Sequence, residues 1–349
     1  MPDVREVFRV ATDQVRSDPD ALQRQHLRQR RLIVRRRVSG FAIAVVILIA
    51  AIAVAVAVMA NRGSHGPRPQ GPPGTRSIHN GPIELFGMTN GVRRPDGTFA
   101  FKCAGGCTEI RGADWSPDGT RLAVITGCGG SCASDNDPYH GIRVIDPSTG
   151  IDQLLVPGEI TGGIAWSPDG DHIAYVDHGS IFVMNSEGVE RRAVALISGD
   201  EIFPSLSWSP DGSRIAYSEH DQIVVVRVDG SGTTTIAYGS DPAWSPDGAS
   251  IAYLSRCVVR LVEADGSSDM VLANLGAVRG FDSCNHAEDL VWSPDGRKLA
   301  AMAEKNYADI FGPATRGVFI VNADGSGARR VSLWNRAIPL IGLTWQPVR

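Results

Sequence analysis

Short runs of apolar residues recur along the chain. Five of them, RLAVIT, HIAYVD, RIAYSE, SIAYLS and KLAAMA, begin at positions 121, 172, 214, 250 and 298. After a loop of variable length, each is followed by a second apolar run that ends in a polar turn, and a weaker run such as QLLVP or RRVSL leads to the next unit. Strand-length runs separated by turn residues predict units of four short β-strands.

The pentapeptide WSPDG accompanies the first apolar run of each unit. Its five copies occupy residues 115–119, 166–170, 208–212, 244–248 and 292–296. A type I turn favours Ser, Pro, Asp and Gly in this order, and the preceding Trp supplies a large apolar body for packing. A turn is needed once per unit, whereas a catalytic group is needed once per active site. We therefore interpret Asp118, Asp169, Asp211, Asp247 and Asp295 as turn formers.

The spacing of the repeat predicts a β-propeller. The tryptophans of the repeat are Trp115, Trp166, Trp208, Trp244, Trp292 and Trp345, separated by 51, 42, 36, 48 and 53 residues. Periods near this length with four strands per unit are typical of propeller blades. Repeated WSPDG followed by I-A-Y and by a strand ending in D-G-S resembles the repeat of the TolB-like, WD-like propeller family. The resemblance covers residues 78–349 and implies an all-β, six-bladed propeller, but no particular activity.

The last repeat is incomplete. It ends as IGLTWQPVR, without strands after Trp345, whereas PIELFGM and TFAFK precede the first full motif. We expect these terminal segments to share one blade, which would close the ring and remove exposed sheet edges. In a second register, Arg94-Pro95-Asp96-Gly97 is a degenerate copy of the turn. Both registers give six blades.

A segment without charged residues, Ser39 to Ala60, precedes the repeats. At 1.5 Å per residue it can cross a hydrocarbon core of about 30 Å as a single transmembrane helix. Seven arginines and no acidic residue lie between positions 21 and 38, which predicts a cytoplasmic N-terminus and a propeller outside the cell membrane. Since Val58-Met59-Ala60 also fits a cleavage site, a cleaved signal peptide is the alternative. The predicted organisation is a basic cytoplasmic tail (1–38), a transmembrane helix (39–60), a Pro/Gly-rich linker (61–77) and the propeller (78–349).

The charge distribution narrows the choice of partners. The net charge is −4, and the excess of arginine in residues 1–38 fits topogenic charge, so we expect no nucleic-acid partner. An apolar stripe at helical spacing in the same tail leaves a cytoplasmic partner of residues 1–38 open.

The six cysteines all lie in the segment predicted to be outside the membrane, where disulfides persist. They are Cys103, Cys107, Cys128, Cys132, Cys257 and Cys284. We expect a bridge between Cys257 and Cys284. The other four pair either within each C-x3-C motif or between the two motifs. Four cysteines can also hold zinc, but outside the cytoplasm disulfides are favoured, so we expect neither a metal nor a cofactor.

The loops opposite the WSPDG turns differ in length. They are long at 126–141, 276–290 and 304–317, and departures from a repeat are where function usually lies. Candidate binding residues in these loops are Asp135, Asn136, Asp137, Tyr139, His140, His286, Glu288, Asp289, Lys305, Asn306 and Tyr307. The Asp135–Asp137 cluster could hold calcium, and His286, Glu288 and Asp289 could serve acid–base chemistry, but both clusters are also ordinary loop chemistry.

The leading hypothesis is a membrane-anchored, extracytoplasmic, non-catalytic module that binds protein or envelope polymer through the long loops. The alternative is an envelope hydrolase or lyase that uses polar residues of the same loops, and a third is a purely structural envelope protein. Carboxylates and histidines converging in a central pocket would favour an enzyme. We expect no catalytic residue to be identifiable from the sequence alone.

Overall fold

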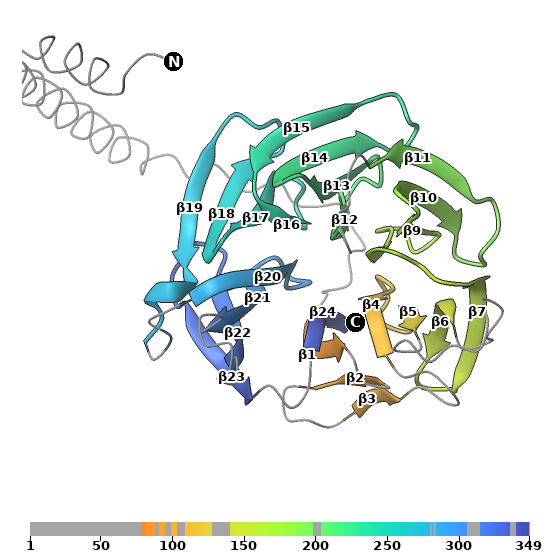
Figure 1. Cartoon of the computed structure of the whole chain (residues 1–349), viewed down its shortest axis with the longest axis horizontal. Coiled ribbons are helices and arrows are strands. Elements are labelled where there is room, and N and C mark those ends of the chain that lie inside the picture. The colour runs from red at the N-terminus through yellow and green to blue at the C-terminus, as the bar shows by residue number, and fades with distance from the viewer. Residues whose placement is uncertain are drawn as a thin grey trace, which may run out of the picture. The chain divides into compact units, whose positions relative to one another are not determined.

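The computed structural model describes residues 79–87, 91–94, 99–102, 109–127, 140–197, 204–279, 281, 284–305, 315–335 and 340–348. These residues form six four-stranded antiparallel sheets arranged around a central axis, which confirms the six-bladed β-propeller (Figure 1). Among them the only helical element is a 3-10 turn, η2 (Leu275–Ala277), and no helix is long and apolar enough to cross a membrane. The predicted transmembrane segment, residues 39–60, lies outside the described residues.

Five blades are formed by consecutive strands. Blade 1 contains β4 (Glu109–Trp115), β5 (Leu122–Gly127), β6 (Gly141–Asp146) and β7 (Ile151–Pro157). Blade 2 contains β8 (Ile164–Trp166), β9 (His172–Asp177), β10 (Ser180–Asn185) and β11 (Arg192–Leu196). Blade 3 contains β12 (Leu206–Trp208), β13 (Arg214–Glu219), β14 (Gln222–Arg227) and β15 (Thr233–Tyr238). Blade 4 contains β16 (Ser240–Trp244), β17 (Ser250–Ser255), β18 (Val258–Glu263) and β19 (Asp269–Asn274). Blade 5 contains β20 (Cys284–Trp292), β21 (Lys298–Lys305), β22 (Thr315–Asn322) and β23 (Arg329–Asn335).

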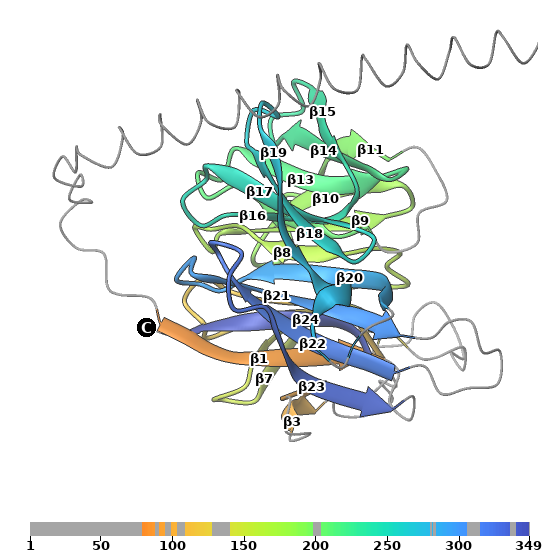
Figure 2. The ribbon, with the colours of Figure 1, turned by 90° about the vertical axis from the view of Figure 1, so that its left-hand side faces the viewer.

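The sixth blade joins the two ends of the described chain, as predicted. Its strand order is β24-β1-β2-β3, with β24 (Leu340–Val348) paired antiparallel to β1 (His79–Gly87), followed by β2 (Gly91–Arg93) and β3 (Phe99–Lys102). Figure 2 shows β1 and β24 side by side. The alternative register is wrong, because Arg94 follows β2 and the segment that it begins connects β2 to β3 within this blade. In its place in the blade, the segment Arg94-Pro95-Asp96-Gly97 therefore corresponds to the polar turns that follow the third strands of the other blades, and not to WSPDG.

The serine of WSPDG is the centre of each turn. In the third copy, Ser209 Oγ donates to Asp211 Oδ1 at 2.6 Å and accepts from the backbone N–H of Arg214 at 2.9 Å. The Gly212 N–H donates to the Ser209 carbonyl at 2.8 Å, which closes the turn. These serines are buried, so their hydroxyls need internal partners. Each copy of the motif therefore supplies its own hydrogen bonds.

Some tryptophans of the repeat connect neighbouring blades by hydrogen bonds or ring contacts. Trp208 Nε1 donates to the Ala165 carbonyl of blade 2 at 3.2 Å, and Trp292 Nε1 donates to the Ala243 carbonyl of blade 4 at 3.0 Å. The guanidinium of Arg214 lies 4.6 Å from the ring centroid of Trp244 in the next blade. Trp208 and Trp292 are thus both apolar filler and hydrogen-bonded connections between blades, whereas Nε1 of Trp166 and of Trp244 has no hydrogen-bond partner among the described residues.

The prediction of a loop over 276–290 is wrong in its second half. Strand β20 already begins at Cys284, so His286, Glu288 and Asp289 belong to the innermost strand of blade 5. The sequence CNHAEDL is polar because part of this strand faces the channel along the axis, and polarity alone was therefore a misleading loop signal.

Candidate functional site

The sequence-predicted binding residues occupy several different environments. His140 is buried, with only 5% of its surface exposed, directly before β6. His286 is exposed on β20, and Lys305 ends β21. Asp135, Asn136, Asp137, Tyr139, Asn306 and Tyr307 lie outside the described residues. Glu288 and Asp289, in contrast, line a cavity on the propeller axis.

One predicted disulfide is present. Cys257 and Cys284 are bonded, with Cα atoms 6.1 Å apart. The bridge ties the turn between β17 and β18 of blade 4 to the first residue of β20 in blade 5. It thereby restrains two neighbouring blades on the face opposite the WSPDG turns. Cys103, Cys107, Cys128 and Cys132 lie outside the described residues.

The axial cavity has a volume of about 610 Å3 and is lined by residues from the innermost strands of all six blades. One ring of its wall comes from the residue three positions before each repeated Trp. In blades 3, 4 and 5 this residue is polar: Ser205, Asp241 and Asp289. In the other three blades it is Gly112, Gly163 and Gly342. The ring therefore has a polar half and a glycine half.

Two of these glycines are required by close packing. A Cβ at Gly163 would lie 2.4 Å from the Pro204 carbonyl oxygen, and one at Gly342 would lie 2.6 Å from Asp289 Oδ2. The carboxylate of Asp289 thus occupies the space that any larger residue at position 342 would need. The glycines and aspartates of the ring are parts of one packing arrangement.

The aspartates of the ring connect blades. Asp241 Oδ1 accepts from Ser205 Oγ at 2.8 Å and from the backbone N–H of Asp289 at 3.1 Å. Asp289 Oδ2 in turn accepts from the backbone N–H of Leu343 on the closing strand β24. This chain of bonds runs through blades 3, 4, 5 and 6.

The backbone at both aspartates is unusual. Asp241 and Asp289 have φ values of 52° and 59°, and the strand register shifts at both positions. Positive φ is uncommon for residues other than glycine, and Asp tolerates it better than most. These irregularities redirect the carboxylates toward neighbouring blades.

Burial shifts the titration of the axial carboxyls. It raises the pKa of Asp289 well above its usual value of 3.8, and the nearby Asp241 carboxylate raises it further. Burial also raises the pKa of Glu288, although its ion pair with Arg316, 3.2 Å long, opposes this. On the other side of the axis, burial raises the pKa of Asp114 to about 7, while the Trp166 N–H, 2.8 Å away, acts in the opposite direction.

The described lining of the cavity therefore presents carboxyl groups, hydroxyls and one guanidinium, that of Arg111. Arg111 Nη1 donates to Glu159 Oε1 at 3.0 Å, and its Nε pairs with Glu109. No histidine lines the described part of the cavity. The described residues also hold no group of three or more His, Cys, Asp or Glu side chains placed to bind a metal ion. This arrangement can accept hydrogen bonds and attract positive charge, and paired carboxyls are also able to exchange protons.

Sequence reasoning missed Asp114, Asp241 and Ser205. A signal was available, because the channel-facing residues stand at fixed offsets before each repeated Trp. Aligning the units on the Trp and reading the third residue before it would have grouped Ser205, Asp241 and Asp289. The hydrogen bonds between blades could not have been deduced, since they depend on the two bulges.

Comparisons with known proteins give structural matches. No protein-family model matches the sequence, and no curated protein matches it. Among solved structures, a chain of the crystal structure titled nidogen/laminin complex matches with a TM-score of 0.56 and 12% identity, over 76% of this chain and 98% of that one. TolB from Acinetobacter baumannii matches with a TM-score of 0.55 and 15% identity, over 76% of this chain and 66% of that one.

A third match, a putative TolB from Agrobacterium tumefaciens, has a TM-score of 0.47 and 20% identity over 74% of this chain and 91% of that one. At these identities the two matches with TM-scores above 0.5 show the fold and not the role. The match covers 66% of the TolB chain, slightly less than two thirds of its length. In its fold, the chain is thus a six-bladed β-propeller similar to the matched part of the TolB structure.

Proposed function

We propose that the protein is a membrane-anchored propeller that acts outside the cytoplasm as a non-catalytic binding module for protein or envelope polymer. Its binding surface is the face opposite the WSPDG turns. The residues 39–60 would form the anchor, and the linker 61–77 would hold the propeller away from the bilayer.

One observation carries this proposal: the departures from the repeat are gathered on one face. The connections between the second and third strands are two residues long after Asp177, Glu219 and Ser255. The corresponding connections in blades 1 and 5, residues 128–140 and 306–314, are much longer. Both long connections and the Cys257–Cys284 bridge are on this face. The bridge restrains the part of this face that blades 4 and 5 form, and a restrained surface reduces the entropic cost of binding.

The comparisons support the choice of a binding role. The nidogen/laminin structure is, by its title, a complex of two proteins, and its propeller-like match covers nearly all of the matched chain. A six-bladed ring offers a rigid platform on which loops of different length can contact another protein.

The enzyme alternative is favoured by one feature of the axis. Asp241 and Asp289 are in contact through the Asp289 N–H, and their mutual repulsion helps to raise the pKa of Asp289. Coupled carboxyls with raised pKa occur in acid–base catalysis, as in some hydrolases and lyases. Against a catalytic role, both side chains already accept hydrogen bonds that hold blades together.

The test is a pull-down from native membranes with the full chain. One variant carries shortened connections in place of 128–139 and 306–314, and the matched control carries Ser231→Lys and Ser267→Lys in exposed turns of the opposite face. We expect specific extracytoplasmic partners to be lost with the shortened connections and kept with the control, while circular dichroism shows both variants folded. Partners that are equally retained by both variants would contradict the proposal. Turnover of envelope glycans or peptides that disappears in Asp289→Asn would favour the enzyme instead.

A further inference from the structure

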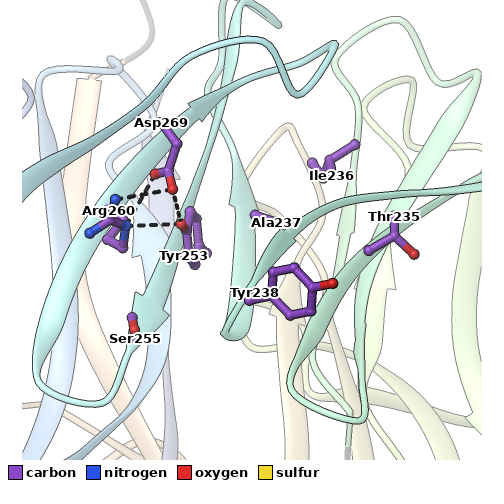
Figure 3. A pocket seen from close by; sticks show the side chains of 8 residues that line it. All are labelled: Thr235, Ile236, Ala237, Tyr238, Tyr253, Ser255, Arg260 and Asp269. Atoms are coloured by element: carbon purple, nitrogen blue, oxygen red, sulfur yellow. Dashed lines mark hydrogen bonds and ion pairs between the residues drawn. The ribbon is translucent and has the colours of Figure 1, made fainter.

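A second cavity lies on the outside of the ring between blades 3 and 4. Its volume is about 500 Å3, within the range of about 300–1,000 Å3 that is typical of small-molecule sites. One wall comes from β15 of blade 3, and the other from β17, β18 and β19 of blade 4 (Figure 3). None of its described lining residues also lines the axial cavity, so the two sites are separate.

The blade 3 wall presents an aromatic ring to solvent. Tyr238 is the last residue of β15, and 75% of its surface is exposed. The chain behind it is held in place: the Gly239 N–H donates to the Asp221 carbonyl at 2.8 Å, and a Cβ at Gly239 would lie 2.5 Å from Tyr253 Cδ2. Tyr238 is therefore an exposed aromatic ring on a rigid base. Such a ring offers a flat apolar surface and a polar tip.

The blade 4 wall presents a fixed network of donors and acceptors. Tyr253 Oη donates to Asp269 Oδ2 at 2.8 Å and accepts from Arg260 Nε at 2.9 Å. Arg260 Nη2 donates to the same carboxylate oxygen of Asp269 at 3.0 Å. Figure 3 shows this network across the open space from Tyr238. Its members hold one another in position, yet the guanidinium and carboxylate retain donor and acceptor capacity toward the cavity.

The charges of the walls select the class of ligand. The positive charge of Arg260 is balanced by the negative charge of Asp269 at 3.0 Å, so neither an anion nor a cation meets a net opposite charge. The hydroxyls of Thr235 and Ser255 add further neutral polar groups. A neutral ligand with one apolar face and a rim of hydroxyls matches these walls. A pyranose sugar has this shape, with C–H groups on one face and hydroxyls around the ring.

We propose that this cavity binds a neutral pyranose sugar, with its apolar face on Tyr238 and its hydroxyls directed toward Arg260 and Asp269, which the buried Tyr253 holds in position.

The other blades show that this combination is not a general property of the repeat. In the groove between blades 2 and 3, Leu196 stands at the position of Tyr238 and Val224 at that of Arg260. In blade 1 the pair Arg143–Asp152 corresponds to Arg260–Asp269, but Val124 replaces Tyr253. The ion pair alone is thus a recurring structural feature. What distinguishes the cavity is the ion pair together with two tyrosines.

The test measures sugar binding to the purified full chain by saturation-transfer NMR and titration calorimetry. The probes are the methyl glycosides of glucose, mannose, galactose and N-acetylglucosamine, with glucose 6-phosphate and glucosamine as charged counterparts. We expect at least one neutral glycoside to bind, and Tyr238→Ala to weaken it at least tenfold. Tyr238→Phe should keep most of the affinity because the ring remains. The matched control Leu196→Ala, at the equivalent exposed position of blade 2, should leave the affinity unchanged.

Three results would overturn the proposal. They are the absence of binding by all four neutral glycosides, binding that Tyr238→Ala leaves intact, and binding of glucose 6-phosphate or glucosamine that is as tight as that of the neutral sugars. Since position 238 is exposed, the variants should remain folded, and thermal unfolding verifies this. The inference does not depend on the proposed function, because the shortened connections at the loop face should leave sugar binding unchanged.

Discussion

At the scale of single residues, the serine of WSPDG supplies several of the hydrogen bonds that stabilise its turn. Its hydroxyl is buried and is used both as donor to the turn aspartate and as acceptor from the backbone five residues later. Pro and Gly set the backbone angles of the turn, whereas Ser and Asp satisfy its polar groups. This division of roles explains why the whole pentapeptide, and not only its Pro-Asp-Gly part, is repeated.

The first prediction concerns this serine. Ser209→Ala leaves the Arg214 N–H without its acceptor, and we expect a loss of about 1–3 kcal/mol in the free energy of unfolding. Ser213→Ala is the matched control, because Ser213 is exposed and donates to the same Asp211 carboxylate at 2.8 Å. Urea unfolding should show a much smaller loss for the control. Equal losses in the two variants would mean that burial of the Ser209 hydroxyl is unimportant.

Two aspartates should affect stability with opposite dependence on pH. The pKa of Asp114 is raised by burial from 3.8 to about 7, so its contribution to stability is fully present below pH 3.8 and is lost as the pH rises through about 7. Asp114→Asn cannot ionise and keeps an acceptor for the Trp166 N–H. We expect it to be more stable than the wild type by about 1–3 kcal/mol at pH 8, with a difference that vanishes near pH 4.

The turn residue Asp211 provides the opposite case. Hydrogen bonds from Ser209 and Ser213 lower its pKa to about 2, so its contribution is present above pH 3.8 and is lost as the pH falls through about 2. Asp211→Asn should therefore be less stable than the wild type from pH 5 to pH 8 and equal to it only at strongly acidic pH. Thermal unfolding over this range measures both variants. If Asp114→Asn and Asp211→Asn changed the stability relative to the wild type in the same direction, the assigned directions of the two pKa shifts would be wrong.

At the scale of elements, the closing strand is the point where the ring depends on distant parts of the sequence. β24 is the innermost strand of blade 6, paired with β1 from His79↔Val348 to Gly87↔Leu340, and Asp289 of blade 5 accepts from its Leu343 N–H. Removal of β24 would leave the edge of β1 unpaired and the Asp289 carboxylate without the Leu343 N–H that it accepts from, and both losses destabilise the fold.

We therefore expect deletion of residues 340–349 to produce a protein that aggregates or unfolds cooperatively at a much lower temperature. A synthetic peptide of residues 336–349 added during refolding should restore a soluble monomer, as judged by size-exclusion chromatography. A scrambled peptide of the same composition is the control. A truncated protein that is soluble and as stable as the wild type would show that the ring does not require this closure.

The disulfide between blades 4 and 5 acts at the same scale. It closes a loop with a sequence separation of 27 residues, and restricting such a loop in the unfolded chain is worth about 3.5 kcal/mol. The double variant Cys257→Ser, Cys284→Ser should lose this amount in urea unfolding. Each single variant should lose about as much as the double variant, because removal of one sulfur already opens the bridge. If the losses in unfolding free energy of the two single variants instead added up to that of the double variant, the two losses would not both come from the opened bridge.

At the scale of the whole molecule, the sequence predicted the number of blades and the closure of the ring, but it did not predict which residues line the axial cavity. The turns and second strands were predictable because WSPDG and runs such as IAYVD report local chemistry, and closure followed from the unmatched Trp345. The positions of Asp241 and Asp289 follow instead from bulges that form only when blades 3 to 6 are side by side. His286 and Glu288 were assigned to a loop because a strand beside a polar channel lacks the apolar alternation of a strand in a core.

The remaining whole-molecule prediction is the orientation of the chain in the membrane. Arginines cluster before residue 39 and all cysteines follow residue 60, and both patterns are expected if the propeller is folded in an oxidising compartment, where the Cys257–Cys284 bridge is stable. In cells stripped of their outer layers, an external protease should digest a C-terminal epitope tag and leave an N-terminal tag protected until the membrane is permeabilised. A cytoplasmic marker protein serves as the control for membrane integrity. Full-length protein released into the medium after loss of the N-terminal tag would instead indicate cleavage after Ala60, and an equally protected C-terminal tag would place the propeller in the cytoplasm.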